Sequence, residues 1–221
     1  MSFSPGTLVS LPAKYNVDDA CPGLVPRVYM NDQLNDCVIA ARAHQTVRLD
    51  YNSGPTLIPE ISDTEVANEY YAEAGAFDVG IVVSHSLAKW QSPGWFAGGV
   101  QRHIGDFSGP LSLNGSRALA GDATTDLTLA GLQSCIVEHT GVQIELKLPV
   151  GITFDNKNSF GPGNDWTDTS EKTSLRHVML LTGYDQKGFI GITWGAQQRM
   201  TWAFLTTYCI GVYWVTKSSA A

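Results

Sequence analysis

Apolar residues recur at helical spacing in four segments of the first two thirds of the chain. Polar residues that can cap a helix precede two of these segments. Asp36 or Asn35 is a suitable N-cap for the first, and Ser62 with Glu65, three residues later, forms a capping box for the second. We therefore predict helices over residues 37–51, 62–74, 82–90 and 126–139.

Alternating apolar and polar residues, the pattern of β-strands, dominate the chain after residue 140. The segment 200–209 fits either a short helix or a strand, and the Gly- and Ser-rich stretch 95–125 has the composition of a loop with short strands. Helices followed by antiparallel strands indicate the α+β fold class. The predicted strands lie at 142–148, 177–185, 188–195 and 212–217.

The whole chain, residues 1–221, is predicted to form a single domain with three parts. Residues 1–30 are rich in Pro and Gly and form an extended arm. Residues from about 31 to 125 form a mainly helical lobe, and those from about 126 to 221 contribute a helix and antiparallel strands. The polar loop 155–174 is too long for a simple connection, so it is a candidate wall of a functional site.

The chain is acidic, with a formal net charge of −7 and a pI near 5.1. It has no Lys/Arg cluster to replace the counterions of phosphates, which argues against a nucleic-acid partner. No stretch approaches the roughly 18 consecutive apolar residues of a membrane span. The first residues lack the basic and apolar regions of a signal peptide. We therefore expect no membrane partner and a cytoplasmic location.

Four cysteines, at positions 21, 37, 135 and 209, lie far apart without a CxxC pair, and no histidine stands at metal-ligand spacing. We expect no metal and no cofactor, and most of the cysteines are expected to be buried. Cys37 differs because it falls in the first turn of a helix. There the helix dipole favours the thiolate, if a histidine carries its proton and N–H donors hold an oxyanion. His44, two turns further along the same face, is expected to pack in the core.

Four segments resemble, in order, the landmarks of the papain-like cysteine peptidases. The run 31–37 (NDQLNDC) resembles the approach to the catalytic helix, where an amide side chain stands six residues before the cysteine. The run 78–80 (DVG), followed by a helix and Trp90, resembles the cleft wall that bears a glycine. The run 175–185 (LRHVMLLTGYD) resembles the histidine strand, and 188–195 (GFIGITWG) the strand that ends in Asn-Ser-Trp-Gly.

This resemblance implies a papain-like architecture, in which a helical lobe with the cysteine helix packs against an antiparallel sheet or barrel lobe with the histidine. It implies Cys37 as the nucleophile and His177 as the base. Asn31 would donate to the oxyanion, with a side chain one methylene shorter than the Gln of the family. Gly80 and Trp194 would belong to the substrate cleft.

The chain resembles uncharacterised bacterial and phage-associated papain-like proteins more closely than secreted papains. Those proteins share the approach Asn-Asp-x-x-Gly-Asp-Cys and a Trp-Gly followed by Met-Thr-Trp-Ala-Phe, a relation that 194–195 and 200–204 reproduce. The resemblance implies a peptide or protein substrate as a partner. It also adds the subunits of a larger assembly as partners and a virion-associated location as an alternative to the cytoplasm.

The chain departs from the family pattern at the residue that orients the histidine. Ile192 stands where the family has Asn, and an isoleucine cannot accept the imidazole N–H. Thr193 is adjacent, but strand alternation is expected to point it to the opposite face. We expect a loop carboxylate such as Asp165 or Asp168, or a backbone carbonyl, to orient His177.

Three functions are compatible with these residues. The first is a cysteine hydrolase that cleaves an amide, peptide or isopeptide bond through a Cys37 thiolate and His177 as base. The second is a catalytically inactive papain-like module with a structural or binding role, for example in a phage particle. Ile192 favours this alternative, whereas Cys37, His177 and Asn31 oppose it. The third is an acyltransferase or cyclase on the same scaffold, with an amine in place of water.

Overall fold

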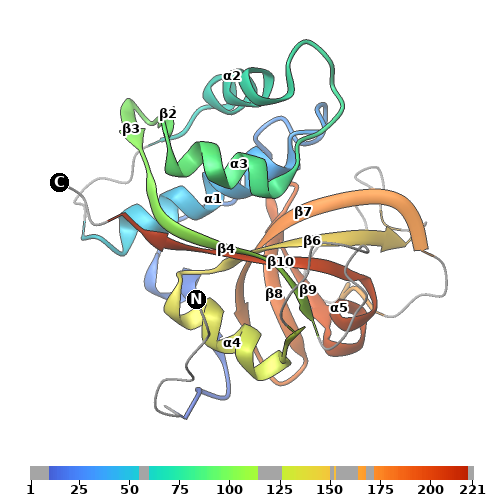
Figure 1. The fold of residues 1–221 in the computed structure, drawn as a ribbon. Helices are drawn as coiled ribbons and strands as arrows, with labels where there is room; N and C mark the ends of the chain where they lie inside the picture. The colour runs from blue at the N-terminus through green and yellow to red at the C-terminus, as the bar shows by residue number, and fades with distance from the viewer. Residues whose placement is uncertain are drawn as a thin grey trace.

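The computed structural model describes residues 10–54, 60–113, 126–149, 152, 164–167 and 172–218. Helices occupy most of the first half of this described chain and strands most of the second half (Figure 1). In chain order the elements are β1 (Tyr15–Asn16), the 3₁₀ helix η1 (Val17–Ala20), α1 (Cys37–Tyr51), α2 (Asp63–Ala74), α3 (Val83–Gln91), β2 (Trp95–Ala97), β3 (Val100–Arg102), β4 (Ile104–Leu113), β5 (Asp126–Leu127), α4 (Leu129–Glu138), β6 (Val142–Pro149), β7 (Lys172–Tyr184), β8 (Gly188–Thr193), β9 (Ala196–Thr201), α5 (Trp202–Tyr208) and β10 (Cys209–Lys217).

The four predicted helices are present as α1 to α4. The predicted capping box of α2 is confirmed, since Ser62 Oγ accepts the Glu65 N–H at 3.2 Å and the Glu65 carboxylate accepts the Ser62 N–H at 2.8 Å. Helix α4 begins later than predicted because Thr128 caps it. The segment 200–209 divides between the end of β9, helix α5 and the start of β10.

The strands form a sheet in the order β5-β4-β10-β6-β7-β8-β9, with β1 beside β7. Among the described strands, β4 and β5 pair in parallel and the other neighbours pair antiparallel. Strand β4 lies in the stretch expected to be mainly loop, so the sheet begins well before residue 125. Gly109 interrupts the strand pattern of β4 in the sequence. A glycine is needed there because a Cβ would lie 2.5 Å from the Val212 carbonyl oxygen of β10. Strand β9 was not predicted.

Two hydrophobic cores lie on opposite faces of the sheet. One contains α4, α5 and the inner residues of β6, and the other packs α1, α2 and α3 against the sheet. Strand β7 contributes to both, because its side chains alternate: Met179 and Leu181 enter the first core and Val178 enters the second. In Figure 1, α1 to α3 lie above the sheet and α4 and α5 lie below it. No helix in the described part is long and apolar enough to span a membrane.

Candidate functional site

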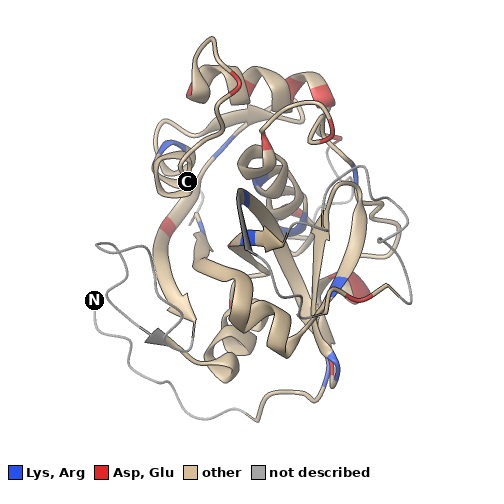
Figure 2. Cartoon of the chain, turned by 90° about the vertical axis from the view of Figure 1, so that its right-hand side faces the viewer, with Lys and Arg blue, Asp and Glu red and all other residues tan. Residues whose placement is uncertain are grey.

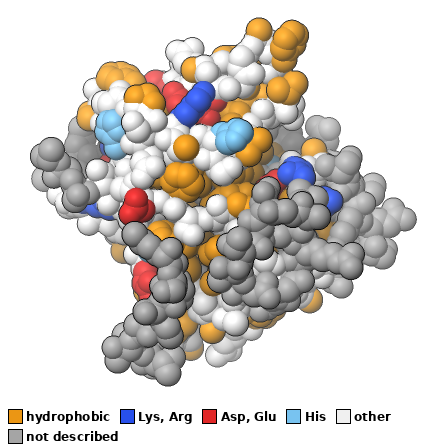
Figure 3. Space-filling view, in the orientation of Figure 1, with side chains coloured by type: hydrophobic (Ala, Val, Ile, Leu, Met, Phe, Trp, Pro, Cys, Tyr) orange, Lys and Arg blue, Asp and Glu red, His pale blue; other side chains and the backbone are white. Residues whose placement is uncertain are grey.

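A cavity of about 1000 Å³ opens between the helices and the sheet. The start of α1, the loop before α3 and strands β4, β6 and β7 all contribute to its lining. Apolar side chains stand exposed on its rim: Val79 is 76% exposed, Val82 57% and Leu175 44%. Apolar side chains (orange in Figure 3) also gather across the middle of the face shown there, between the helices and the sheet. Charged groups in the lining include Glu145 and Arg176, which are paired at 3.0 Å.

Cys37 is the first residue of α1 and lines this cavity. It is half-buried, whereas the other three cysteines are buried. Desolvation is the largest influence on the Cys37 thiol and raises its pKa to about 12. The Val178 and Val38 backbone N–H groups, which donate to the sulfur, oppose this rise, and the charges of Asp36 and Glu145 add to it. Burial therefore opposes the thiolate that the helical position favours.

His177 lies on β7, directly before the Val178 N–H that contacts the Cys37 sulfur. Its side chain is buried, and its ring stacks on Trp194 with the centroids 4.4 Å apart. Its Nε2 atom lies 2.6 Å from the Thr193 Oγ1 atom. Burial lowers the pKa of His177 to about 3, so the imidazole is neutral at ordinary pH.

The hydrogen bond to Thr193 shows that the strand-alternation argument against this residue was wrong. Leu180 of β7 pairs with Ile192 of β8, so these two side chains share a face of the sheet. Thr193, one residue on, shares the other face with Met179 and therefore with His177. Asp165, named as an alternative partner, lies 3.7 Å from Arg199. Asp168 lies outside the described residues.

Asn31 makes its amide contacts at the entrance to α1. Its Nδ2 atom donates to Asp36 Oδ1 at 3.0 Å and, more weakly, to the Leu34 carbonyl at 3.5 Å. Asp36 occupies the N-cap position, as predicted, but its side chain makes no capping hydrogen bond. The structure therefore shows Asp36 and Leu34 as the acceptors of the Asn31 amide, and its contact with an oxyanion stays a prediction.

The predicted cleft glycine, Gly80, lines the cavity, with a φ of +79°. Tyr70 of α2 fixes this loop: its hydroxyl donates to Asp78 at 2.5 Å and accepts the Gly80 N–H at 3.1 Å. Asp78 also accepts the backbone N–H of Asn35 at 2.8 Å. The loop is therefore bonded to the entrance of the cysteine helix. Trp194 and His177 are not among the described residues that line the cavity, and they lie together next to Thr193.

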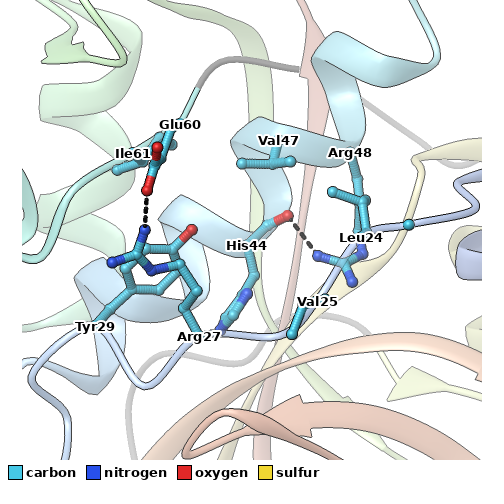
Figure 4. A pocket seen from close by; sticks show the side chains of 10 residues that line it. Leu24, Val25, Arg27, Tyr29, His44, Val47, Arg48, Glu60 and Ile61 are labelled. Carbon is cyan, nitrogen blue, oxygen red and sulfur yellow. Dashed lines mark hydrogen bonds and ion pairs between the residues drawn. The ribbon is translucent and has the colours of Figure 1, made fainter. Parts of the chain in front are cut away.

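A second cavity of about 330 Å³ lies between the N-terminal arm and α1 (Figure 4). His44 packs in this region as predicted, with its ring centroid 4.9 Å from that of Tyr29. The Arg27 carbonyl accepts a hydrogen bond from the His44 ring, but burial outweighs this contact and lowers the pKa of His44 to about 3. Both arginines here are already paired, Arg27 with Glu60 and Arg48 with Asp18. Within the described chain, no three His, Cys, Asp or Glu side chains cluster as a metal site.

No protein-family model matches the chain, and no curated protein matches its sequence. Its structure does match solved structures. Xylellain, a cysteine protease from Xylella fastidiosa, aligns over 98% of this chain and 91% of its own, with a TM-score of 0.65 and 11% identity. The fold is papain-like. Bromelain from Ananas comosus, solved with the E64 inhibitor, covers 94% of this chain over 100% of its own at a TM-score of 0.66 and 12% identity.

A third structure with this fold is the cysteine protease CMS1MS2 from Carica candamarcensis, with a TM-score of 0.60 and 12% identity over 94% of this chain and 99% of its own. These likenesses confirm the predicted papain-like architecture and the α+β class. At such low identity they establish the fold, while the roles of individual residues rest on the site itself.

Proposed function

We propose that this protein is a cysteine hydrolase that cleaves amide or peptide bonds, with Cys37 as the nucleophile and His177 as the base. The observation that carries this proposal is the placement of Cys37. It begins a buried helix, lines the cavity, and accepts a hydrogen bond from the residue that follows His177. The papain-like fold, shared with proteins described as cysteine proteases, supports the same conclusion.

The mechanism begins from a neutral thiol and a neutral imidazole. If His177 donates its Nε2–H to Thr193, Nδ1 is left as the basic nitrogen. The reaction requires the His177 ring to reach the Cys37 sulfur, although strand alternation places this ring on the face of Met179 and the sulfur on the face of Val178. His177 then takes the thiol proton as the sulfur attacks the substrate carbonyl, and the Cys37 backbone N–H and Asn31 amide stabilise the oxyanion. The imidazolium then protonates the leaving amine. Water, deprotonated by His177, hydrolyses the thioester and restores the thiol.

The cavity favours a peptide or protein substrate over a small molecule. It is open and large, apolar side chains stand exposed on its rim, and its lining includes the Glu145–Arg176 pair. Such a surface suits an extended chain that places apolar side chains on the rim. An isopeptide substrate and a role within a larger assembly are compatible with the same cavity.

A second candidate function is a catalytically inactive module, and a specific observation favours it. His177 shares a face of β7 with Met179, whereas Cys37 packs with Val178 on the other face, and burial opposes the charged form of both groups. An inactive module would use the apolar rim to bind a partner without cleaving it.

Hydrolysis of a fluorescence-quenched peptide library separates these two functions. The hydrolase should cleave part of the library, Cys37→Ala should abolish cleavage, and His177→Ala should reduce it at least a hundredfold. Cys135→Ala, which alters a buried cysteine of α4, is the matched control and should retain activity. Alkylation of Cys37 by iodoacetamide, followed by mass spectrometry, gives a second readout. If the library is uncut and His177→Ala leaves the alkylation rate unchanged, the hydrolase proposal is wrong.

A further inference from the structure

Asp36 is a fully buried carboxyl group beside the candidate nucleophile, and no capping role accounts for it. Its exposure is 0%, its side chain makes no capping hydrogen bond to α1, and its Oδ2 atom has no hydrogen-bond partner. The Asn31 amide, at 3.0 Å, donates to the other oxygen. An unpaired carboxyl oxygen is costly to bury, so a residue kept there solely for stability would be expected to cap the helix.

The contact with Asn31 gives this carboxyl a task within the proposed reaction. An amide nitrogen has two N–H groups. Asp36 accepts a hydrogen bond from one of them at 3.0 Å. The Leu34 carbonyl oxygen lies 3.5 Å from the amide nitrogen, which is too far for a strong hydrogen bond from the second N–H. The second N–H is therefore available for another acceptor. Asp36 is adjacent to Cys37 in the chain, so the amide it holds lies at the start of the cysteine helix.

We propose that Asp36 is a positioning residue, which holds the Asn31 amide at the head of the cysteine helix so that its free N–H can donate to the oxyanion. This inference rests on the proposed hydrolase function. The side chain of Asn31 is short and flexible, and a donor serves an oxyanion only if its position is fixed before the charge develops. Asp36 supplies that fixation from a buried position.

The environment of Asp36 suits this task. Burial raises its pKa to about 7, and the Asp78 and Asp32 carboxylates add to the rise, whereas the Asn31 amide and the Asp36 backbone N–H lower it. Tyr70 and Cys37 are the other titratable groups affected by its charge. A protonated carboxyl can hold the amide through Oδ1 without placing a negative charge beside the thiol and the oxyanion.

The variants Asp36→Asn and Asp36→Ala separate positioning from packing. Asp36→Asn keeps an oxygen that can accept the Asn31 N–H, so kcat should stay within about threefold of the unmodified protein. Asp36→Ala removes the acceptor, and kcat should fall roughly tenfold or more with KM unchanged, because a poorly placed oxyanion donor affects the transition state. Asp19→Asn, which changes an exposed carboxylate on η1, is the matched control and should leave both constants unchanged.

A double-mutant cycle shows whether Asp36 acts through Asn31. Once Asn31→Ala has removed the amide, adding Asp36→Ala should lower kcat no further than about twofold. If Asp36→Ala still causes its full loss of kcat in the Asn31→Ala background, the positioning role is wrong and the residue acts on folding or on Cys37 alone.

A measurement without substrate keeps this inference separate from the hydrolase proposal. The one Asn31 side-chain amide proton that is bonded to Asp36, followed by ¹⁵N–¹H NMR, should exchange slowly with solvent in the unmodified protein and in Asp36→Asn. It should exchange at least tenfold faster in Asp36→Ala. If exchange is the same in all three proteins, Asp36 does not hold Asn31, whatever the protein hydrolyses. If exchange changes as expected but no peptide is cleaved, the hydrolase proposal fails, and the catalytic use of the held amide fails with it.

Discussion

A threonine hydroxyl orients the histidine of the candidate site. Thr193 Oγ1 lies 2.6 Å from His177 Nε2, and both side chains are buried. A hydroxyl can accept the Nε2–H as an amide oxygen would, and the acceptor fixes both the ring position and the tautomer. Trp194 covers one face of the ring with stacking at 4.4 Å. The buried bond therefore fixes which ring nitrogen of His177 carries the proton.

Replacing Thr193 by Val should weaken catalysis by removing this acceptor. One buried hydrogen bond is worth about 1 kcal/mol, so kcat should fall roughly fivefold, while Thr193→Ser should retain most of the rate. The ¹⁵N shifts of the His177 ring should show a mixed tautomer in Thr193→Val only. Ile192→Val, on the opposite face of β8, is the control. Equal kcat in Thr193→Val and the unmodified protein would show that His177 is oriented by another group.

The wall of the cavity is held by one tyrosine of α2. Tyr70 contacts both Asp78 and Gly80, and its side chain is fully buried. Asn35 bonds the same loop to the start of α1, through its N–H at 2.8 Å and its amide at 3.1 Å. The distance between helix and cavity wall is therefore set by a few polar contacts. We expect a change in this distance to affect substrate binding more than it affects the chemical step.

Tyr70→Phe should raise KM several-fold with a smaller change in kcat. The variant keeps the ring but leaves the Gly80 N–H without its acceptor and Asp78 without one donor. Steady-state kinetics on the best library peptide would measure both constants. Tyr71→Phe alters a more exposed neighbour on the same helix and should change neither. A loss confined to kcat would contradict the assignment of this loop to binding.

Arg42 of α1 connects this helix to α2 and α3 within the core that these helices form against the sheet. Its guanidinium pairs with Glu69 at 2.9 Å and Glu73 at 2.6 Å on α2, and it donates to the Ser86 carbonyl of α3 at 2.7 Å. Trp90 and Trp95 lie near its faces, at 5.8 and 5.5 Å. Acidic side chains are frequent on this helical part of the molecule (Figure 2). The buried Arg42 guanidinium balances the negative charge of two of them, Glu69 and Glu73.

Arg42→Met should destabilise the protein by about 3–5 kcal/mol, because the buried Glu73 carboxylate would lose its partner. Urea unfolding followed by circular dichroism would measure the change. Arg27→Met removes the exposed pairs with Glu60 and Asp63 and should cost about 1 kcal/mol or less. Adding Glu69→Gln and Glu73→Gln to Arg42→Met should restore part of the stability. If the two arginine variants are equally stable, the buried pairs do not hold α1 to α2.

The helices were readable from the sequence because their signals are local. The capping box at Ser62 lies within a few residues of the helix it starts. Strand pairing depends on partners far away, so β4 was largely missed and Thr193 was assigned to the wrong face. The position of Asp36 was predicted, but its contact with Asn31 was not, since a side-chain pairing across a turn has no periodic signal.

The molecule as a whole buries ionisable groups whose effects on stability oppose one another. His44 and His177 have pKa values lowered to about 3, and Asp36 has one raised to about 7. Between about pH 4 and 6.5 the unfolded chain binds a proton at each histidine that the folded chain does not bind, so stability falls with falling pH. Over the same range only the folded chain keeps the Asp36 proton, so this group adds stability as pH falls.

His44→Gln should therefore flatten the dependence of stability on pH. Each buried neutral histidine contributes a slope of up to about 1.4 kcal/mol per pH unit below its unfolded pKa of about 6.5. Removing His44 should lower the measured slope of unfolding free energy by about that amount, even if the variant is less stable at every pH. Urea unfolding at several pH values from about 4.5 to 6.5 gives the slope.

Two further variants test the direction in which each buried group changes the slope of stability against pH. His85→Gln changes an exposed histidine on α3 and should leave the slope unchanged. Asp36→Asn removes the group that gains stability in acid, so its slope should become steeper by a similar amount. A slope in His44→Gln equal to that of the unmodified protein would mean that the His44 imidazole gains its proton in the folded state. The second cavity, where this ring lies against Tyr29, would then admit the water needed to solvate the charge.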